Sequence, residues 1–193
     1  QSERILEAGK KSGLIPKIHA DEIVNLGGAE LAAKVGAISA EHLLTASDEG
    51  IKALAEAGTI ACLLPATALF LQTQAANGRK MIDMGVPVAI STDCNPGSSP
   101  TTSMPLVMNL ACLLMGMTPA ESLSAATYNA ACAINREDRL GSIEVGKQGD
   151  LVLWNVDNYR KLQYLFGVNH VKKVWKKGVL VVNRDDRPLA QTS

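Results

Sequence analysis

The sequence predicts an α/β fold with a parallel sheet, followed by a small antiparallel sheet. Four short apolar runs rich in β-branched residues recur roughly 20 to 30 residues apart, and a helical segment follows each run. Such spacing is typical of βα units, in which helices cover a parallel sheet. Near residue 137 the composition changes to glycine turns between short β runs, which favours antiparallel pairing there.

The four expected strands are "LIPKIHA" (14–20), "VGAISA" (35–40), "GTIACLLP" (58–65) and "VPVAIST" (86–92). A closed (β/α)8 barrel needs eight strands and typically about 250 residues. Four βα units in 193 residues supply about half of one. The chain is therefore expected to be a half-barrel, an open sheet or a fragment.

Helices are predicted over residues 25–36, 47–58, 104–117 and 118–134. Gly36 and Gly58 end the first two, as glycines do at helix C-termini. The last is the clearest, because Thr118 and Glu121 match a capping box and Pro119 suits a first turn. Residues 104–117 are apolar but too short to cross a bilayer, so a buried helix is expected.

The part after residue 137 is expected to form strands within 140–156 and 171–183. Its basic stretch "HVKKVWKKG" (170–178) alternates Lys with Val and Trp. This alternation favours the solvated face of an edge strand over a binding patch. The terminal "RDDRPLAQTS" is expected to be frayed.

The composition favours a small-molecule partner in the cytoplasm. Nineteen basic residues balance nineteen acidic ones, so no overall field attracts nucleic acid or an anionic membrane. No signal peptide or membrane span is evident. The four cysteines are widely separated and form no C-x-x-C pair, as in a reducing compartment.

Titratable residues follow the strands at the end where parallel α/β proteins place their active sites. His19, His42 and Asp93 come at the ends of three of the four runs, and Glu22 follows His19 by three residues. Each has an ordinary alternative, a packed histidine or a turn-forming Asp. Their joint placement favours a hydrolytic metal centre, since zinc or iron takes His nitrogens and carboxylates, and an Asp can also accept a proton.

Other polar residues near these runs give weaker indications. The loop "DCNPGSSP" (93–100) offers glycine and hydroxyl donors that suit an anionic group, and Asp21 is expected in a solvated loop. Cys94 has no cationic neighbour in sequence, so we interpret it as a small loop residue. His170 is expected to be structural.

Together, "KIHADE", His42 in "SAEHL", "STDCNPG", "PAESLSAATYNAACAI" and "LGSIEVGKQGDLVLWN" resemble the C-terminal half of the imidazolonepropionase family, within the amidohydrolase superfamily. The resemblance extends from the first helix to about residue 183. It implies half of a metal-dependent (β/α)8 barrel over 1–137, part of a composite β-sandwich over 138–185 and a flexible tail over 186–193. It also implies hydrolysis of the cyclic amide C–N bond of 4-imidazolone-5-propanoate, giving N-formimidoyl-L-glutamate in histidine degradation.

The resemblance implies a role for each matching residue. His19 and Asp93 would bind one metal ion, zinc or iron, and Asp93 would take the proton of the attacking water. Glu22 would contact the imidazolone ring, and His42 would orient the water or stabilise the oxyanion. The substrate pocket would be completed by Asn95, Gly97 and Ser98.

The sequence departs from this family in lacking the H-x-H ligand pair of the first barrel strand. It also starts without Met, on a helical pattern with no cap. We therefore expect a fragment that is inactive alone, need not retain metal, and forms a homodimer or otherwise self-associates through an exposed half-barrel edge. Another cyclic amidase or deaminase of the superfamily, or a non-catalytic dimerising half-barrel, remain alternatives.

Overall fold

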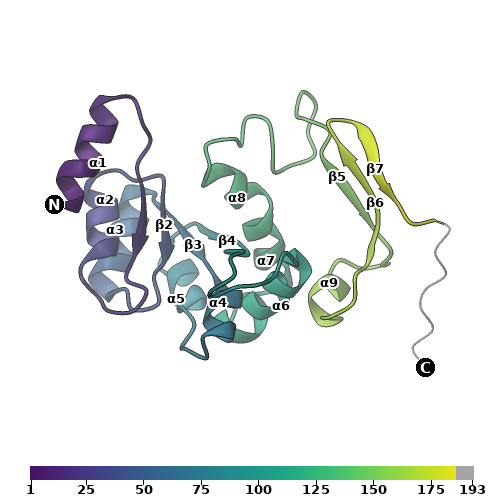
Figure 1. Cartoon of the computed structure of the whole chain (residues 1–193), viewed down its shortest axis with the longest axis horizontal. Coiled ribbons are helices and arrows are strands. Elements are labelled where there is room, and N and C mark those ends of the chain that lie inside the picture. The colour runs from purple at the N-terminus through teal and green to yellow at the C-terminus, as the bar shows by residue number, and fades with distance from the viewer. Residues whose placement is uncertain (186–193) are drawn as a thin grey trace.

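A parallel four-stranded sheet forms the first half of the molecule in this computed structural model, which describes residues 1–185 (Figure 1). Its strands are β1 (Lys17–Ala20), β2 (Ser39–His42), β3 (Ile60–Leu63) and β4 (Val88–Ile90), in chain order. All three pairings are parallel, as predicted. The strands begin later than expected, because Pro16, Gly36, Gly58 and Pro87 occupy the turns that lead into them.

Five helices belong to these βα units: α1 (Ser2–Lys11), α2 (Gly28–Lys34), α3 (Asp48–Ala57), α4 (Pro65–Phe70) and α5 (Gly78–Asp83). The Ser47 side chain accepts a hydrogen bond from Gly50 N, and Gly58 ends α3 in the left-handed region, as predicted. Helices α4 and α5, each only six residues long, were not predicted. Helices α2 and α3 pack on each other and lie along one side of the sheet (Figure 1).

The two faces of the sheet are covered differently. Side chains such as Ala40, Leu63 and Ile90 pack into the main core with the helices. The other face carries a small separate cluster of Ile60 and Ala89 with Ala133, which follows α8 (Tyr128–Cys132). We refer to this second side as the inner face, since in a closed barrel it would face the lumen.

The predicted single helix over 118–134 is wrong. It is two helices, α7 (Pro119–Ala126) and α8, because Thr127 leaves the helical region at φ −124° and ψ −88°. Asn129 Nδ2 donates to Val88 O at 2.7 Å and ties α8 to β4. Gly141 crosses at the break, where an added Cβ would lie 2.7 Å from Ala131 Cβ, so only glycine fits. The predicted capping box of Thr118 and Glu121 is confirmed.

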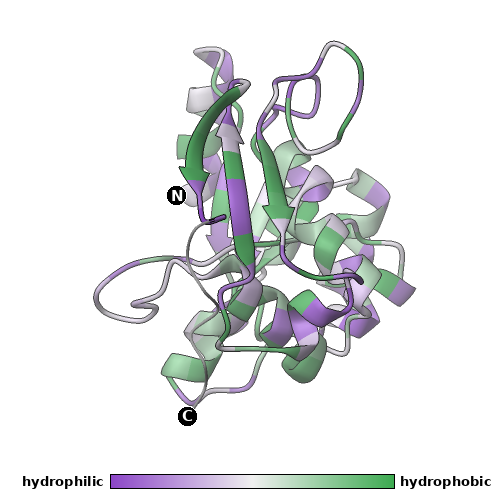
Figure 2. Cartoon of the chain, turned by 90° about the vertical axis from the view of Figure 1, so that its right-hand side faces the viewer, coloured by the Kyte–Doolittle hydropathy of each residue, from purple (hydrophilic) through white to green (hydrophobic). Residues whose placement is uncertain are grey.

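The second sheet is antiparallel, with β5 (Leu151–Trp154), β6 (Val171–Lys176) and β7 (Val179–Asn183) in the order β5-β6-β7. The basic stretch forms β6, and the expected edge position is wrong, since β6 is hydrogen-bonded on both sides. Figure 2 shows it as a largely hydrophilic strand between two hydrophobic ones. Residues 140–150, expected to contain strand, form turns instead.

A short helix, α9 (Lys161–Tyr164), fastens the second half of the chain to α6 (Met104–Met115). Asn109, buried in α6, donates from Nδ2 to Gln163 O at 2.5 Å, and Gln163 Nε2 donates to Ser122 Oγ at 3.2 Å. A division into units at residue 137 stays a prediction. The flexible tail expected over 186–193 lies outside the described residues, among which no helix has the length and apolarity to span a membrane.

Replacing Thr118 by Ala should lower the free energy of unfolding by about 1 kcal/mol, because the side chain that caps the third helical N–H is lost. Thr118→Ser keeps the hydroxyl and should stay close to the unmodified protein. Urea denaturation of the three proteins measures the difference. Equal losses for both substitutions would contradict the capping role.

Candidate metal centre

Parallel pairing brings the strand residues that the sequence singled out to the same end of the sheet. In register, His19 lies opposite Glu41 and Ala20 lies opposite His42, the last residue of β2. His42 and Leu43 both adopt positive φ, at 74° and 59°. Such backbone costs about 1–3 kcal/mol per residue and needs support from its surroundings. Part of this support is the hydrogen bond that Leu43 N donates to Ala20 O at 3.0 Å.

Glu22 lies between the two histidines. Its Oε2 is 2.8 Å from His19 Nε2, and its Oε1 is 3.3 Å from His42 Nδ1. The two imidazole rings are 4.1 Å apart at their centroids, with 35° between their planes. The His19 side chain is 63% exposed, whereas that of His42 is 6% exposed. The three residues therefore form one compact group that opens to solvent on the His19 side.

Burial favours the neutral form of His42, which can act as a metal ligand or orient a bound group. Desolvation, the larger effect, lowers the pKa of His42 below its ordinary value, while the Glu22 carboxylate opposes that shift. The ring is therefore favoured in its neutral form, which has a lone pair to offer. The 3.3 Å contact to Glu22 lacks hydrogen-bond geometry, so within the described part of the chain His42 Nδ1 is buried without a hydrogen-bond partner.

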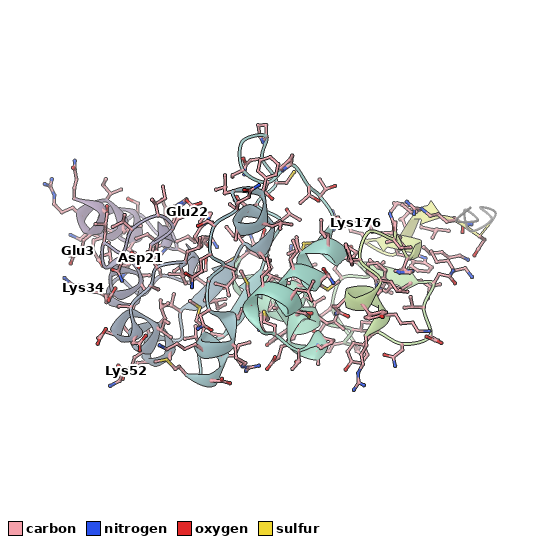
Figure 3. All side chains as sticks on the ribbon, turned by 90° about the horizontal axis from the view of Figure 1, so that it is seen from below. Glu3, Asp21, Glu22, Lys34, Lys52 and Lys176 are labelled. Atoms are coloured by element: carbon pink, nitrogen blue, oxygen red, sulfur yellow. The ribbon has the colours of Figure 1, made fainter. Side chains whose placement is uncertain are left out.

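Asp21 holds the loop that carries Glu22, and the expectation of a solvated loop residue is wrong for it. Asp21 is buried. Its Oδ1 accepts from Leu26 N and Gly28 N at 3.1 and 2.9 Å, and its Oδ2 accepts from Ala29 N at 2.8 Å. A carboxylate at a helix N-terminus is favourable because it satisfies free N–H groups. Figure 3 shows Asp21 and Glu22 close together on this loop, far from Lys176 in the antiparallel sheet.

Asp93 comes three residues after β4 and also has a positive φ, of 49°. Its Oδ2 accepts a hydrogen bond of 2.7 Å from the Thr67 hydroxyl in α4. Asp93 is outside the group formed by His19, Glu22 and His42 but lines one cavity together with the two histidines.

The loop after Asp93 is organised by Asn95. Its Oδ1 accepts from Gly97 N and Ser98 N, both at 2.8 Å, and its Nδ2 donates to Asp93 O at 2.7 Å. The two N–H groups suggested for an anionic group are thus directed at Asn95 in this structure. The substrate-contacting roles of Asn95, Gly97 and Ser98 stay predictions.

An open cavity of about 690 Å³ runs along the inner face of the sheet. It is lined by residues from all four strands, by the loop after β4 and by α7 and α8. Lys17 and Glu41, which the sequence analysis did not single out, form an ion pair of 3.0 Å in its wall. Lys17 also donates to Ala133 O at 2.9 Å, so its charge is engaged within the chain.

The donor set fits a metal ion. One ligand atom each of His19, Glu22 and His42 lies within 4.8 Å of the others, and residues 1–185 supply no hydrogen-bond partner for the buried His42 Nδ1. Imidazole and carboxylate donors suit both zinc and iron. The assignment of His19 and Asp93 as the ligands stays a prediction, because the structure groups Glu22 and His42 with His19 and leaves Asp93 apart.

Residues 6–181 match the Amidohydrolase family, and the chain therefore belongs to the amidohydrolase family. Among its curated relatives is the imidazolonepropionase of Geobacillus kaustophilus (strain HTA426), 65% identical over 183 residues, covering 95% of this chain and 43% of that protein. The imidazolonepropionase of Bacteroides thetaiotaomicron is 54% identical over 180 residues, covering 93% of this chain and 43% of that protein. The chain thus spans less than half the length of these relatives.

Solved structures share the fold. An adenosine deaminase from Xanthomonas campestris with bound zinc is 25% identical, with a TM-score of 0.80 over 94% of this chain and 48% of the other. Atrazine chlorohydrolase from Arthrobacter aurescens TC1 has a TM-score of 0.81 at 19% identity, over 94% of this chain and 47% of the other, and shows the fold alone. These likenesses confirm the predicted partial barrel.

Substituting Asp21 by Ala should lower the free energy of unfolding by about 1–3 kcal/mol, because the N–H groups of Leu26, Gly28 and Ala29, in the loop before α2 and in its first turn, lose their acceptor. Asp21→Asn keeps one oxygen and should fall between the two proteins. Urea denaturation measures the order. If the Ala and Asn variants were both as stable as the unmodified protein, the anchoring role would be wrong.

Cys94 should be the first thiol of the folded chain to react with iodoacetamide, because it is exposed. Burial, with a smaller effect of Glu41, raises the pKa of the cavity residue Cys62 to about 12. Burial also raises the pKa of Cys112 and Cys132. Thiolate is the reactive form, so these three should react slowly until the protein is denatured.

Mass spectrometry of peptides at timed intervals identifies the order of labelling. Cys94→Ser should remove the fast phase and leave the slow one. Rapid labelling of Cys62 in the folded chain would contradict the burial described here.

Proposed function

We propose that this chain supplies part of the active site of an imidazolonepropionase, which hydrolyses the cyclic amide C–N bond of 4-imidazolone-5-propanoate to give N-formimidoyl-L-glutamate. The observation that carries the proposal is the group of His19, Glu22 and His42, whose two histidines line one open cavity with Asp93. The 65% identity to a relative named imidazolonepropionase supports the choice of substrate.

Each side chain has a part in this reaction. A bound metal ion lowers the pKa of water toward 7 and polarises the amide carbonyl. His19 and Asp93 would hold the ion, and Asp93 would accept the proton of the attacking water and pass it to the leaving nitrogen. Glu22 would orient the imidazolone ring, and His42 would orient the water or stabilise the oxyanion. The loop of Asn95, Gly97 and Ser98 would bound the substrate pocket.

The chain alone is proposed to be inactive, because its site is one-sided. The chain covers 43% of the Geobacillus kaustophilus relative and contains no H-x-H pair. The His19 side chain is largely exposed on the inner face of the sheet. The remainder of a relative would close the cavity and add ligands, with zinc or iron as the metal.

The free edge of β1 could also bind a second copy of the chain. Within residues 1–185, β1 pairs with β2 alone, so its other edge has unpaired backbone groups. Exposed strand edges readily pair with another strand. We propose that the isolated chain self-associates through this edge, as a homodimer. A non-catalytic dimerising module is the function that this edge would support if no turnover could be restored.

A deaminase or another cyclic amidase is the second candidate. The zinc-containing adenosine deaminase of Xanthomonas campestris favours it, at 25% identity and a TM-score of 0.80. Deamination and cyclic amide hydrolysis share an attacking water and a proton shuttle. The substrate therefore has to be decided by turnover.

Joining this chain to the N-terminal part of the Geobacillus kaustophilus relative should give a protein that holds about one metal ion and hydrolyses imidazolonepropionate, because the joined parts complete the cavity. The 193-residue chain alone should show no turnover. Mass spectrometry measures the metal content of the two proteins, and absorbance measures their product formation.

The joined protein carrying Asp93→Asn is the matched control and should lose turnover while remaining folded. Turnover by the isolated chain would contradict the one-sided site. A folded, metal-loaded joined protein that deaminates adenosine but leaves imidazolonepropionate intact would favour the second candidate.

A further inference from the structure

Thr67 is a buried hydroxyl at the edge of the proposed site. It lies in α4, directly after β3, the one strand of the sheet for which the sequence analysis expected no titratable residue at the end. The residue is 2% exposed, and its Oγ1 donates to Asp93 Oδ2 at 2.7 Å. A buried hydroxyl normally has a hydrogen-bond partner. Here that partner is the carboxylate to which the proposed reaction assigns the proton transfer.

The remaining contacts of Asp93 restrain its backbone rather than its carboxylate. Asn95 Nδ2 donates to Asp93 O at 2.7 Å, and Ser99 Oγ donates to Thr92 O at 2.6 Å, which fixes the loop on either side. Neither bond limits rotation of the Asp93 side chain. Within residues 1–185, Thr67 is the residue that donates a hydrogen bond to this carboxylate.

We propose that Thr67 is the positioning residue for Asp93. By occupying Oδ2, it fixes the carboxylate torsion and leaves Oδ1 as the oxygen for the metal ion or the proton. This inference rests on the proposed function of Asp93. It extends that function to a residue that touches neither the substrate nor the reacting atoms.

The hydroxyl suits this task because it is neutral and rigidly held. A cationic partner would hold the carboxylate by charge and weaken it as a base, whereas a hydroxyl orients it with less effect. Catalytic groups need to be held within about 0.5 Å of their working geometry. Loss of a residue that supports a metal ligand typically costs about 10- to 100-fold in metal affinity or activity.

The test compares Thr67→Val, which removes the hydroxyl at nearly constant volume, with Thr67→Ser, which keeps it. Thr59→Val is the matched control, because Thr59 is also buried but donates to a backbone oxygen, Ala37 O at 2.9 Å, and not to Asp93. In the joined protein described above, Thr67→Val should lower kcat and the metal affinity measured by chelator competition, by about 10- to 100-fold, with little change in KM. Thr67→Ser and Thr59→Val should stay close to the unmodified protein.

A crystal structure of the 193-residue chain carrying Thr67→Val supplies a readout that needs neither metal nor turnover. The Asp93 carboxylate should adopt a different or mixed side-chain torsion, while the Thr67→Ser chain keeps the original one. An unchanged, singly ordered Asp93 in Thr67→Val would overturn the proposal whatever the substrate is. If Asp93 moves but the joined protein has no activity toward imidazolonepropionate, the proposed function fails and the positioning role stands.

Equal losses of kcat and metal affinity in Thr67→Val and Thr59→Val would also overturn the proposal. Those losses would then come from removing any buried hydroxyl. A loss of metal affinity in Thr67→Ser, as large as that in Thr67→Val, would overturn the proposal as well, because Thr67→Ser keeps the hydroxyl. Thermal unfolding of all three variants verifies that they are compared as folded proteins.

Discussion

The parallel register of β1 and β2 is the constraint on which the candidate site depends. Ala20 pairs with His42, and His19 pairs with Glu41. Side chains alternate between the two faces of a strand, so a slip by one residue would move His19 from the inner face into the helical layer. The outer face specifies the register, because Ala20 and Ala40 are almost fully buried there. The packing of small apolar residues on one face thus determines which polar groups meet on the other.

Residues with an unfavourable backbone conformation gather at the carboxyl end of the strands, where the candidate site lies. Asp21, His42, Leu43 and Asp93 all have positive φ, and they lie at the end of a strand or within three residues after it. Hydrogen bonds between neighbouring loops support these conformations, such as that from Thr45 N, in the loop after β2, to Asp21 O, in the loop after β1, at 2.9 Å. Backbone of this kind clusters at functional sites because it aims side chains that an ideal strand end would not aim. His42 is the example, since its turn allows a residue at the end of β2 to contact Glu22.

Much of the fold follows from local patterns in the sequence. The spacing of apolar runs predicted the four strands and their parallel pairing, and Ser47 and Thr118 marked helix starts that the structure contains. Long-range contacts decided the features that were missed. The break at Thr127 depends on the close crossing of Gly141, and β6 is central because β5 and β7 flank it. Neither partner is visible from the local sequence.

In the candidate site, too, local sequence predicted some features and long-range contacts decided the others. The rule that polar residues follow parallel strands located His19, His42 and Asp93, but it did not give their partners. Glu22 contacts both histidines only because Asp21 bends the loop onto α2. Thr67 escaped notice because a hydroxyl does not titrate, although it follows a strand as the others do. A search for any hydrogen-bonding side chain at those positions would have included it.

Anomalous diffraction tests the central claim most directly, on crystals of this chain joined to the N-terminal part of its Geobacillus kaustophilus relative. Data collected at the absorption edge of the bound metal locate the ion without reference to activity. We predict a single strong peak in the inner-face cavity, within bonding distance of His19 and Asp93. A metal-loaded crystal whose peak lay away from both residues would contradict the assignment of the metal centre to the carboxyl end of these strands.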